Sequence, residues 1–281
     1  MPKYRMLLCE FPGFRQADPD STGYAGDLRL RWDRDPDIGQ GNHARWYKAD
    51  TPITMSRNIA MQVAVENNFD FAVFLDADMA PDLPYPGAKP FWESSWEFIK
   101  NHNGPCIIAA PYSGPPPSEL TYVFEYTNTE TDDPNPNFQL AMVPRSKAAR
   151  MTGITQVAAL PTGLMIIDMR IIKKMRNPIF YYEWKDDGPI CEHCGVKKPG
   201  PQVEKASTED VSFSRDVDSM GFPLYCNWDA WAGHRKPKLV GKPGLLGDDV
   251  ISQQLRGRAA ELEAERKQRE LSPSLLSERL A

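Results

Sequence analysis

Apolar and polar residues follow one another along the chain in blocks that predict helices and strands in turn. Apolar residues recur at helical spacing within 54–68, and either Thr54 or Ser56 can cap a helix there. The continuous apolar run 71–75 comes next and predicts a buried strand. A helix followed by a fully apolar strand is typical of an α/β sheet that is covered by helices on both faces.

The pattern repeats further along the chain. Residues 90–102 predict a helix, and the apolar run 106–110 predicts a second strand. The later expected elements are two antiparallel extended segments at 121–126 and 138–143, strand-like residues 154–168 interrupted at 161–163, a short helix at 169–176, an aromatic strand at 179–184, a helix from Ser207 or Thr208 to Gly221, and a last strand at 223–228.

These elements predict one α/β domain with a mixed, mainly parallel sheet and helices on both faces. We expect it to span residues 1–240, with a polar insert at 185–206. The front segment 16–50 is polar and predicts irregular structure. Beyond the domain, 241–281 forms a predicted tail whose amphipathic helix, 248–270, packs on the body or contacts a partner.

Composition narrows the class of protein. The chain has 281 residues, of which 41% are hydrophobic, and no apolar run approaches the roughly 18 residues of a membrane-spanning helix. We therefore expect a cytoplasmic protein with no membrane partner. The net charge of −5 argues mildly against a protein held on nucleic acid mainly by backbone charge and leaves a local basic patch open. Five cysteines do not indicate a disulfide framework.

Two carboxylates follow the predicted strand 71–75. Asp76 and Asp78 are one residue apart, so an extended backbone points both side chains the same way. Ligands of parallel α/β sheets bind at this carboxyl edge. A divalent cation with oxygen ligands, Mg²⁺ or Mn²⁺, would relieve the repulsion between the two acids. The alternative is a pair of solvated turn acids.

An ordered set of motifs accompanies this pair, and it resembles the GT-A glycosyltransferases of the family 2-like kind over about residues 50–236. The motifs are Arg57-Asn58 at a helix start, Asp76-Ala77-Asp78 after a strand, Pro161-Thr162-Gly163, Glu209-Asp210 opening a helix, and the histidine of "AGH", His234. The resemblance implies a GT-A, Rossmann-like fold and a nucleotide-sugar donor.

The resemblance also implies roles for these residues. Asp76, Asp78 and His234 are the implied ligands of Mn²⁺ or Mg²⁺, which holds the donor diphosphate. Asp210 is the implied general base for the acceptor hydroxyl, with Glu209 supporting it. The alternative for His234 is a structural histidine near two tryptophans, and for the acid pair a helix start favoured by the helix dipole.

Further residues are expected to contact the substrates. Arg57, Asp76 and Glu10 are the candidates for donor binding, since arginines and helix N-termini favour phosphate. In the resembled fold, the acceptor side would include Gly163, Glu183 and Trp184. The polar front segment departs from the family pattern, which has a strand, a helix and a second strand there, so the contacts to the nucleotide base cannot be assigned.

The insert carries a cysteine pair. Cys191 and Cys194 have the spacing of a zinc knuckle, which aims two thiolates at one structural Zn²⁺. No second such pair exists in the sequence, so further ligands would come from distant residues or a second chain. The alternative is an exposed loop with two free thiols. In either case the insert is a candidate acceptor-recognition loop.

The leading hypothesis is a metal-dependent glycosyltransferase that moves a sugar from a nucleotide-sugar to an acceptor hydroxyl. Proteins of the resembled kind act on glycans, on proteins or on modified bases of phage DNA, so a hydroxylated DNA base is among the candidate acceptors. The alternatives are another nucleotide-dependent transferase, such as a nucleotidyltransferase, and a non-catalytic sugar-binding protein. A nucleotidyltransferase calls for a glycine-rich loop after the first strand, where "FPGFRQ" has one glycine.

Overall fold

The structure is a computed structural model of the chain. It describes residues 2–13, 19–49, 52–114, 120–127, 140–186, 193, 203–235 and 239–240. The predicted C-terminal helix at 248–270 and the cysteine pair Cys191 and Cys194 lie outside these residues, so both stay predictions.

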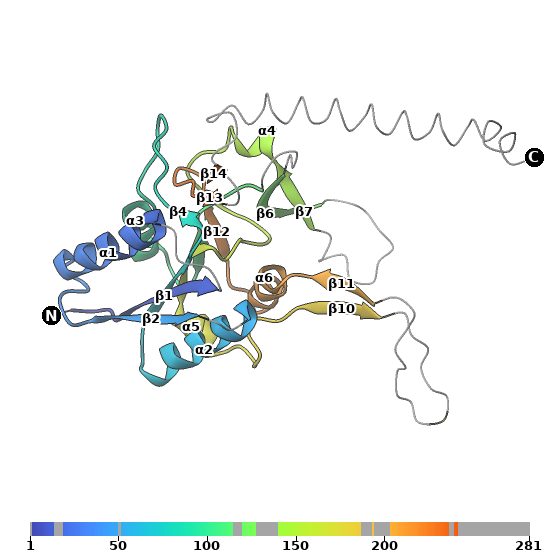
Figure 1. Ribbon diagram of the computed structural model, residues 1–281, viewed down its shortest axis with the longest axis horizontal. Coiled ribbons are helices and arrows are strands. Elements are labelled where there is room, and N and C mark those ends of the chain that lie inside the picture. Colours follow the sequence, from blue (N-terminus) through green and yellow to red (C-terminus); the bar gives the residue numbers. More distant parts are fainter. Residues whose placement is uncertain are drawn as a thin grey trace, which may run out of the picture.

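A seven-stranded sheet forms the centre of the molecule (Figure 1). Its strands lie in the order β2 (His43–Ala49), β1 (Met6–Gly13), β3 (Phe71–Asp76), β9 (Leu164–Asp168), β5 (Ile107–Ala109), β12 (Leu224–Asn227) and β8 (Ile154–Gln156). The pairings make β2, β1, β3, β5 and β12 run in one direction, while β9 and β8 run in the other. The sheet is therefore mixed and mainly parallel, which confirms the predicted α/β class.

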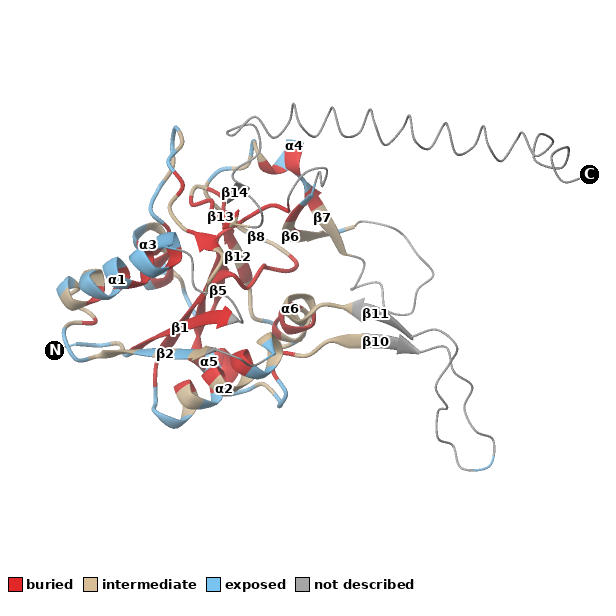
Figure 2. Ribbon diagram, viewed as in Figure 1, coloured by how far each residue is buried: buried red, intermediate tan, exposed pale blue. Residues whose placement is uncertain are grey.

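Helices cover both faces of this sheet. Helices α1 (Pro19–Arg34) and α3 (Phe91–Asn101) pack on one face, and α2 (Ile53–Glu66), α5 (Met169–Ile172) and α6 (Glu209–Ser219) pack on the other. The short α4 (Arg145–Ala148) follows β7. Figure 2 shows that the central strands and the inward sides of the helices are buried. The expected two-sided covering is confirmed.

Strand β1 shows why the apolar runs are continuous. Leu7 and Cys9 point into the core under α2, while Met6 and Leu8 point into the core under α1 and α3. Because successive side chains of a strand face opposite ways, a strand buried on both faces needs an apolar residue at every position. Each large side chain removed from water contributes about 1.5–3 kcal/mol before entropy is counted.

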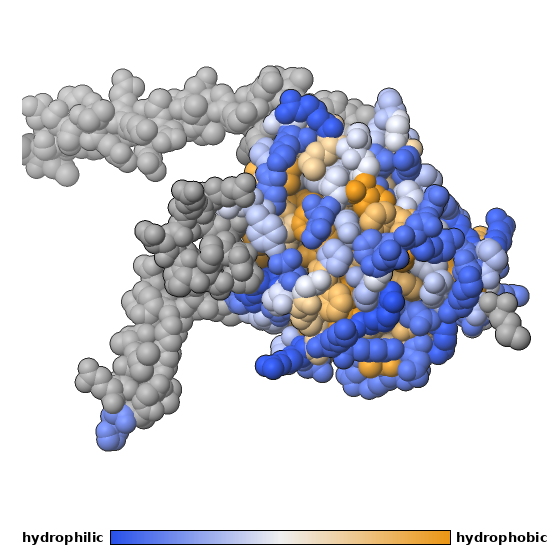
Figure 3. All heavy atoms as spheres, turned by 180° about the vertical axis from the view of Figure 1, so that it is seen from behind, coloured by the Kyte–Doolittle hydropathy of each residue, from blue (hydrophilic) through white to orange (hydrophobic). Residues whose placement is uncertain are grey.

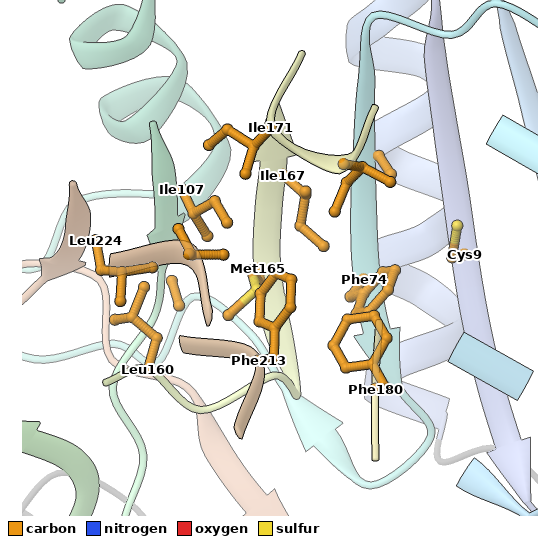
Figure 4. Packing of buried hydrophobic residues seen from close by; sticks show 14 of the residues in the cluster. Cys9, Phe74, Ile107, Leu160, Met165, Ile167, Ile171, Phe180, Phe213 and Leu224 are labelled. Atoms are coloured by element: carbon orange, nitrogen blue, oxygen red, sulfur yellow. The ribbon is translucent and has the colours of Figure 1, made fainter. Parts of the chain in front are cut away.

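The core under α2, α5 and α6 is seen from close by in Figure 4, where Phe74 of β3 and Met165 and Ile167 of β9 meet Phe180 and Phe213. Phe180 and Phe213 stack with their ring centroids 4.5 Å apart. This packing fixes α6 against the sheet and therefore fixes where α6 begins.

Three smaller sheets extend the molecule. Strand β13 (Gly233–Arg235) pairs with β4 (Met79–Ala80) and with β14 (Leu239–Val240). The predicted antiparallel excursion is confirmed as β6 (Leu120–Tyr126) and β7 (Leu140–Pro144). The third pair is β10 (Glu183–Asp186) and β11 (Val203–Ser207).

The prediction of irregular structure at 16–50 is wrong. This segment contains helix α1 and strand β2. Tyr24, Leu28 and Trp32 recur every four residues and are buried, so they form a narrow apolar stripe on an otherwise polar helix. The many charged residues between them hid this stripe. The front of the chain thus has the strand, helix and second strand that it was expected to lack.

The aromatic strand expected at 179–184 is also corrected. Strand β10 begins only at Glu183, while Ile179 and Phe180 lie buried ahead of it. The side chain of Asn58 forms hydrogen bonds with the backbone of both residues. Its Oδ1 accepts from the N–H groups of Ile179 and Phe180 at 2.7 and 3.1 Å, respectively. Its Nδ2 donates to the Phe180 carbonyl at 2.7 Å. An amide side chain therefore replaces a neighbouring strand here.

Helix α2 begins one residue before the expected caps. Its flanking residue is Pro52, which makes no side-chain capping bond, and Thr54 and Ser56 lie inside the helix. The other expected helices and strands agree with the structure to within a few residues at their ends, except that α5 is shorter than the expected 169–176. No helix among the described residues is long and apolar enough to cross a membrane.

Candidate functional site

The two acids of the Asp-x-Asp motif separate in the structure instead of pointing the same way. Strand β3 ends at Asp76, and a turn at 77–78 leads into β4. The backbone of this turn is fixed, because Asp76 N–H donates to the Gly163 carbonyl at 2.8 Å and Ala77 N–H donates to the Phe11 carbonyl at 3.2 Å. Each carboxylate consequently meets its own partner.

Arg57 is the partner of Asp76. Its Nη2 lies 3.0 and 2.9 Å from the two Asp76 carboxylate oxygens, and its Nη1 donates to Glu209 Oε1 at 2.8 Å. The arginine is 2% exposed and lies over the rings of Phe11 and Phe74. Burial lowers the pKa of Arg57, but the neighbouring carboxylates of Asp76 and Glu209 outweigh it and hold the pKa above its usual value.

His234 is the partner of Asp78. Strand β13 pairs with β4 so that His234 is opposite Met79, and the Arg235 N–H donates to the Asp78 carbonyl at 2.7 Å. This pairing brings His234 Nε2 to 3.3 Å from Asp78 Oδ2. His234 is buried, and its Nδ1 has no hydrogen-bond partner among the described residues. The small sheet thus joins residues that are far apart in the sequence.

Glu209 and Asp210 open helix α6, as the sequence predicted. Burial raises the pKa of Asp210 and the nearby Glu209 adds to the increase, while a hydrogen bond from the Thr208 side chain and the charge of Arg57 oppose it. A carboxyl group with a raised pKa is better suited to accept a proton near neutral pH than an ordinary aspartate.

Tyr112 connects these groups, and the sequence reasoning missed it. Its ring lies 5.0 Å from that of His234, and burial together with the carboxylates of Asp76 and Asp210 raises its pKa. Tyr112 comes two residues after the apolar run 106–110, at the same carboxyl edge of the sheet as Asp76. This position was the available signal. Arg57, Asp76, Asp78, Asp210 and His234 therefore lie around one tyrosine.

Gly163 lies directly against this tyrosine. A Cβ atom at position 163 would be 3.0 Å from Tyr112 Oη, from Tyr112 Cε1 and from Met79 Sδ. Such contacts are tighter than nine in ten real Cβ contacts, so Tyr112 and Met79 would have to give way by a few tenths of an ångström, and the glycine lets the chain approach them closely at this point. Gly163 thus helps to shape the site.

Glu183 and Trp184 were expected at the acceptor side. Glu183 accepts from Arg215 Nη1 at 2.5 Å, and the same arginine donates to the Tyr181 hydroxyl at 2.8 Å. These bonds tie the base of β10 to α6. The neighbouring Tyr182 hydroxyl donates to Glu209. The side chain of Trp184 lies outside the described residues.

Glu10, the third expected donor-binding residue, lies in the second half of β1 and is 4% exposed. Its carboxylate binds the guanidinium of Arg45 on β2, and that guanidinium lies 5.2 Å from the ring centroid of the exposed Tyr47. The carboxylate of Glu10 is thus engaged by a cation of β2, and the described hydrogen bonds and ion pairs do not join it to Arg57.

The fit of a divalent cation can be judged from these positions. Two ligands that each bind a metal at about 2.1 Å at right angles are about 3 Å apart, which agrees with the 3.3 Å between Asp78 and His234. Within the described part of the chain, however, no three His, Cys, Asp or Glu side chains gather closely enough to hold a metal. Asp76 stands apart from the other two because it pairs with Arg57.

The charge of the site nevertheless favours a further cation. One cation, Arg57, lies among four carboxylates, those of Asp76, Asp78, Glu209 and Asp210. Burial raises the pKa of Asp76, and the negative charges of Asp78 and Glu209 raise it further, although Arg57 lowers it. Seen from behind, the face of the molecule is mostly hydrophilic, with hydrophobic side chains showing between the hydrophilic ones (Figure 3).

Comparisons with known proteins found similarity in structure only. No family model matches the chain, and no curated protein matches it in sequence. Among solved structures, A197 from STIV has 14% identity and a TM-score of 0.49, covering 85% of this chain and 94% of its own. GalNAc-T7, solved with UDP, GalNAc and Mn²⁺, has 9% identity and a TM-score of 0.41, covering 83% of this chain and 44% of its own. Because both TM-scores lie below 0.5, the function is argued below from the geometry of the site.

Proposed function

We propose that this protein is a metal-dependent glycosyltransferase that moves a sugar from a nucleotide-sugar donor to an acceptor hydroxyl. The observation that carries the proposal is the meeting of Asp78 with His234 beside Arg57, Asp76 and Asp210. These residues come from separate elements and lie at the carboxyl edge of a mainly parallel sheet, where α/β proteins bind ligands.

In this proposal Asp78 and His234 would hold the cation, with Asp76 as the third predicted ligand. The remaining ligands would come from the donor and from water. When bound, the cation neutralises the negative charge that builds on the leaving nucleoside diphosphate.

The protein residues supply the proton transfer. The acceptor hydroxyl oxygen forms a bond to the anomeric carbon while the bond from that carbon to the diphosphate breaks. Asp210 takes the hydroxyl proton, because its buried position raises its pKa and makes it a suitable base. Glu209 stays paired with Arg57 and Tyr182. This sequence of events inverts the anomeric configuration, as a single displacement must.

The acceptor is proposed only as a class, a hydroxyl of a glycan, a protein or a hydroxylated DNA base. The base of the β10–β11 pair adjoins Glu209 through Tyr182, so it is the proposed acceptor side of the site. Cys191 and Cys194 remain candidate ligands for a structural Zn²⁺ in this insert.

A thermal-shift screen tests the donor half of the proposal. We expect Mn²⁺ together with one of the UDP-, GDP- or CMP-sugars to raise the melting temperature, because a ligand that binds only the folded state stabilises it. The same sugar with a chelator in place of Mn²⁺ should have a smaller effect. No shift across all three nucleotide classes would contradict the proposal.

A further inference from the structure

We propose that Arg57 is a positioning residue that ties the donor side of the site to the acceptor side, and that it does not bind the donor phosphate. This inference rests on the proposed function for its kinetic consequences. Its structural basis is the pair of contacts from one guanidinium, to Asp76 at the end of β3 and to Glu209 at the start of α6, which are 133 residues apart in the sequence.

The side chain of Arg57 has little capacity left for a phosphate. Its Nη2 is shared between both oxygens of Asp76, and its Nη1 is engaged by Glu209. Two N–H groups remain, the second one of Nη1 and that of Nε, which has no partner among the described residues. Both are enclosed, since Arg57 is 2% exposed above the rings of Phe11 and Phe74. A donor phosphate would have to open this packing in order to reach them.

An arginine is suited to this task because its planar guanidinium offers donors in fixed directions. One nitrogen faces β3 and another faces α6, so the distance between Asp76 and Glu209 is set by a rigid group. A lysine carries one compact charge and cannot hold both carboxylates in the same geometry.

The consequence concerns the choice of base. Glu209 is held from two sides, by Arg57 and by the hydroxyl of Tyr182. The neighbouring Asp210 makes neither of these contacts among the described residues; its carboxylate accepts instead from the Thr208 side chain and, at 3.2 Å, from the adjacent Val211 N–H. Fixing Glu209 therefore leaves Asp210 as the carboxylate that can face an acceptor.

The test compares Arg57→Met, Glu209→Gln and the double variant in the full chain, using Mn²⁺ and the nucleotide-sugar found in the thermal-shift screen. We expect Arg57→Met to lower kcat about 100-fold, since misplacing a catalytic group by about 1 Å costs that much, with a much smaller change in the donor KM. The double variant should be no slower than Arg57→Met alone, because both changes act on the same contact: methionine removes the guanidinium and glutamine removes the carboxylate charge.

A matched control is Arg170→Met. Arg170 also binds an aspartate, Asp168, through several hydrogen bonds. Asp168 is in register with Phe71, which lies at the end of β3 opposite to Asp76. Its kcat should match that of the unchanged protein. If Arg57→Met does not fold, Arg57→Lys is the second variant. It keeps the charge but cannot contact Asp76 and Glu209 in the same geometry, so it should show the same fall in kcat.

Two results would overturn the inference. A raised donor KM with unchanged kcat would make Arg57 a direct phosphate ligand, and multiplicative losses in the double variant would show that the two residues act independently.

A urea unfolding cycle on the same variants separates this inference from the proposed function. The destabilisations of Arg57→Met and Glu209→Gln should be less than additive in the double variant, whether or not the protein transfers a sugar. Less-than-additive destabilisation in a protein that transfers no sugar would reject the proposed function but support the contact between Arg57 and Glu209. Additive destabilisation in an active enzyme would reject the coupling of Arg57 and Glu209 alone.

Discussion

At the scale of single residues, Asp76 and Asp78 illustrate how one turn separates two similar groups. Asp76 pairs with the guanidinium of Arg57, whereas Asp78 faces the buried imidazole of His234. Two carboxylates that would repel each other in an extended strand are thereby given different environments. The pair can then take different parts in binding a donor.

The metal prediction belongs to this scale. Asp78→Asn and His234→Ala should each weaken Mn²⁺ binding at least about tenfold, because each removes a proposed ligand. A titration followed by Mn²⁺ electron paramagnetic resonance measures this effect without requiring activity. Asp76→Asn in the same titration tests whether the third predicted ligand contributes.

The chain offers a matched control for these variants. Asp33 also pairs with a histidine, His43, whose side chain is 7% exposed: Asp33 Oδ1 lies 2.8 Å from His43 Nε2. The Nδ1 of this histidine likewise has no partner among the described residues. Asp33→Asn should leave the Mn²⁺ affinity unchanged. Equal affinities in Asp78→Asn, His234→Ala and the control would remove the proposed metal site.

A second residue prediction concerns Asp210. Asp210→Asn should still bind the donor with Mn²⁺ but should lose about 10²–10⁴-fold in transfer, because the amide cannot accept the proton. In the unchanged enzyme kcat/KM should fall as the pH decreases through the pKa of Asp210. Burial raises that pKa, so the fall should occur above the usual aspartate value of about 3.9. A profile that is flat down to pH 4 would assign the base elsewhere.

The sequence reached most of these residues through the order of the motifs, but it could not assign their contacts. Arg57 was expected at a phosphate, and only the packing of α2 against β3 and α6 brings it between two carboxylates. Tyr112 carries no motif of its own. Its place depends on the position of β5 in the sheet, which the linear order does not reveal.

At the scale of elements, the site depends on how closely β9, β4 and the residues after β5 approach one another. Gly163, the residue directly before β9, carries no side chain, and Tyr112 and Met79 fill the space beside it. Close packing of this kind has little room for an added methyl group.

Gly163→Ala should therefore lower the free energy of unfolding by about 1–3 kcal/mol, since the new Cβ would meet Tyr112 and Met79 at 3.0 Å. Gly26→Ala in helix α1 is the matched control, because nothing lies within 4 Å of its new Cβ. That control should stabilise the protein by about 0.5–1 kcal/mol, the cost of a glycine inside a helix. Urea unfolding measures both, and an unchanged Gly163→Ala would contradict the packing described.

Element prediction succeeded where one physical signal dominated. The strands at 71–75 and 106–110 are almost purely apolar, and the structure has β3 and β5 there. Helix α1 was missed because its apolar stripe is narrow, and the strand at 179–184 was misplaced because Asn58 replaces the hydrogen bonds of a partner strand. Aromatic residues indicate burial, and burial alone does not make a strand.

At the scale of the whole molecule, a mainly parallel sheet gathers the ends of distant segments at one edge. The α/β class and the covering of both faces were predictable, because continuous apolar strands alternate with amphipathic helices. The order of the strands was not, since β9 inserts between β3 and β5 and runs against both. That insertion is what brings Gly163 to Asp76.

The most direct test of the account is slow hydrolysis of nucleotide-sugars by the purified chain, with water in place of the unknown acceptor. Release of the nucleoside diphosphate should require Mn²⁺ or Mg²⁺, should stop in chelator, and should be lost in Asp78→Asn but not in Asp33→Asn. Release at the full rate in chelator or in Asp78→Asn would contradict the account, as would no release from any UDP-, GDP- or CMP-sugar.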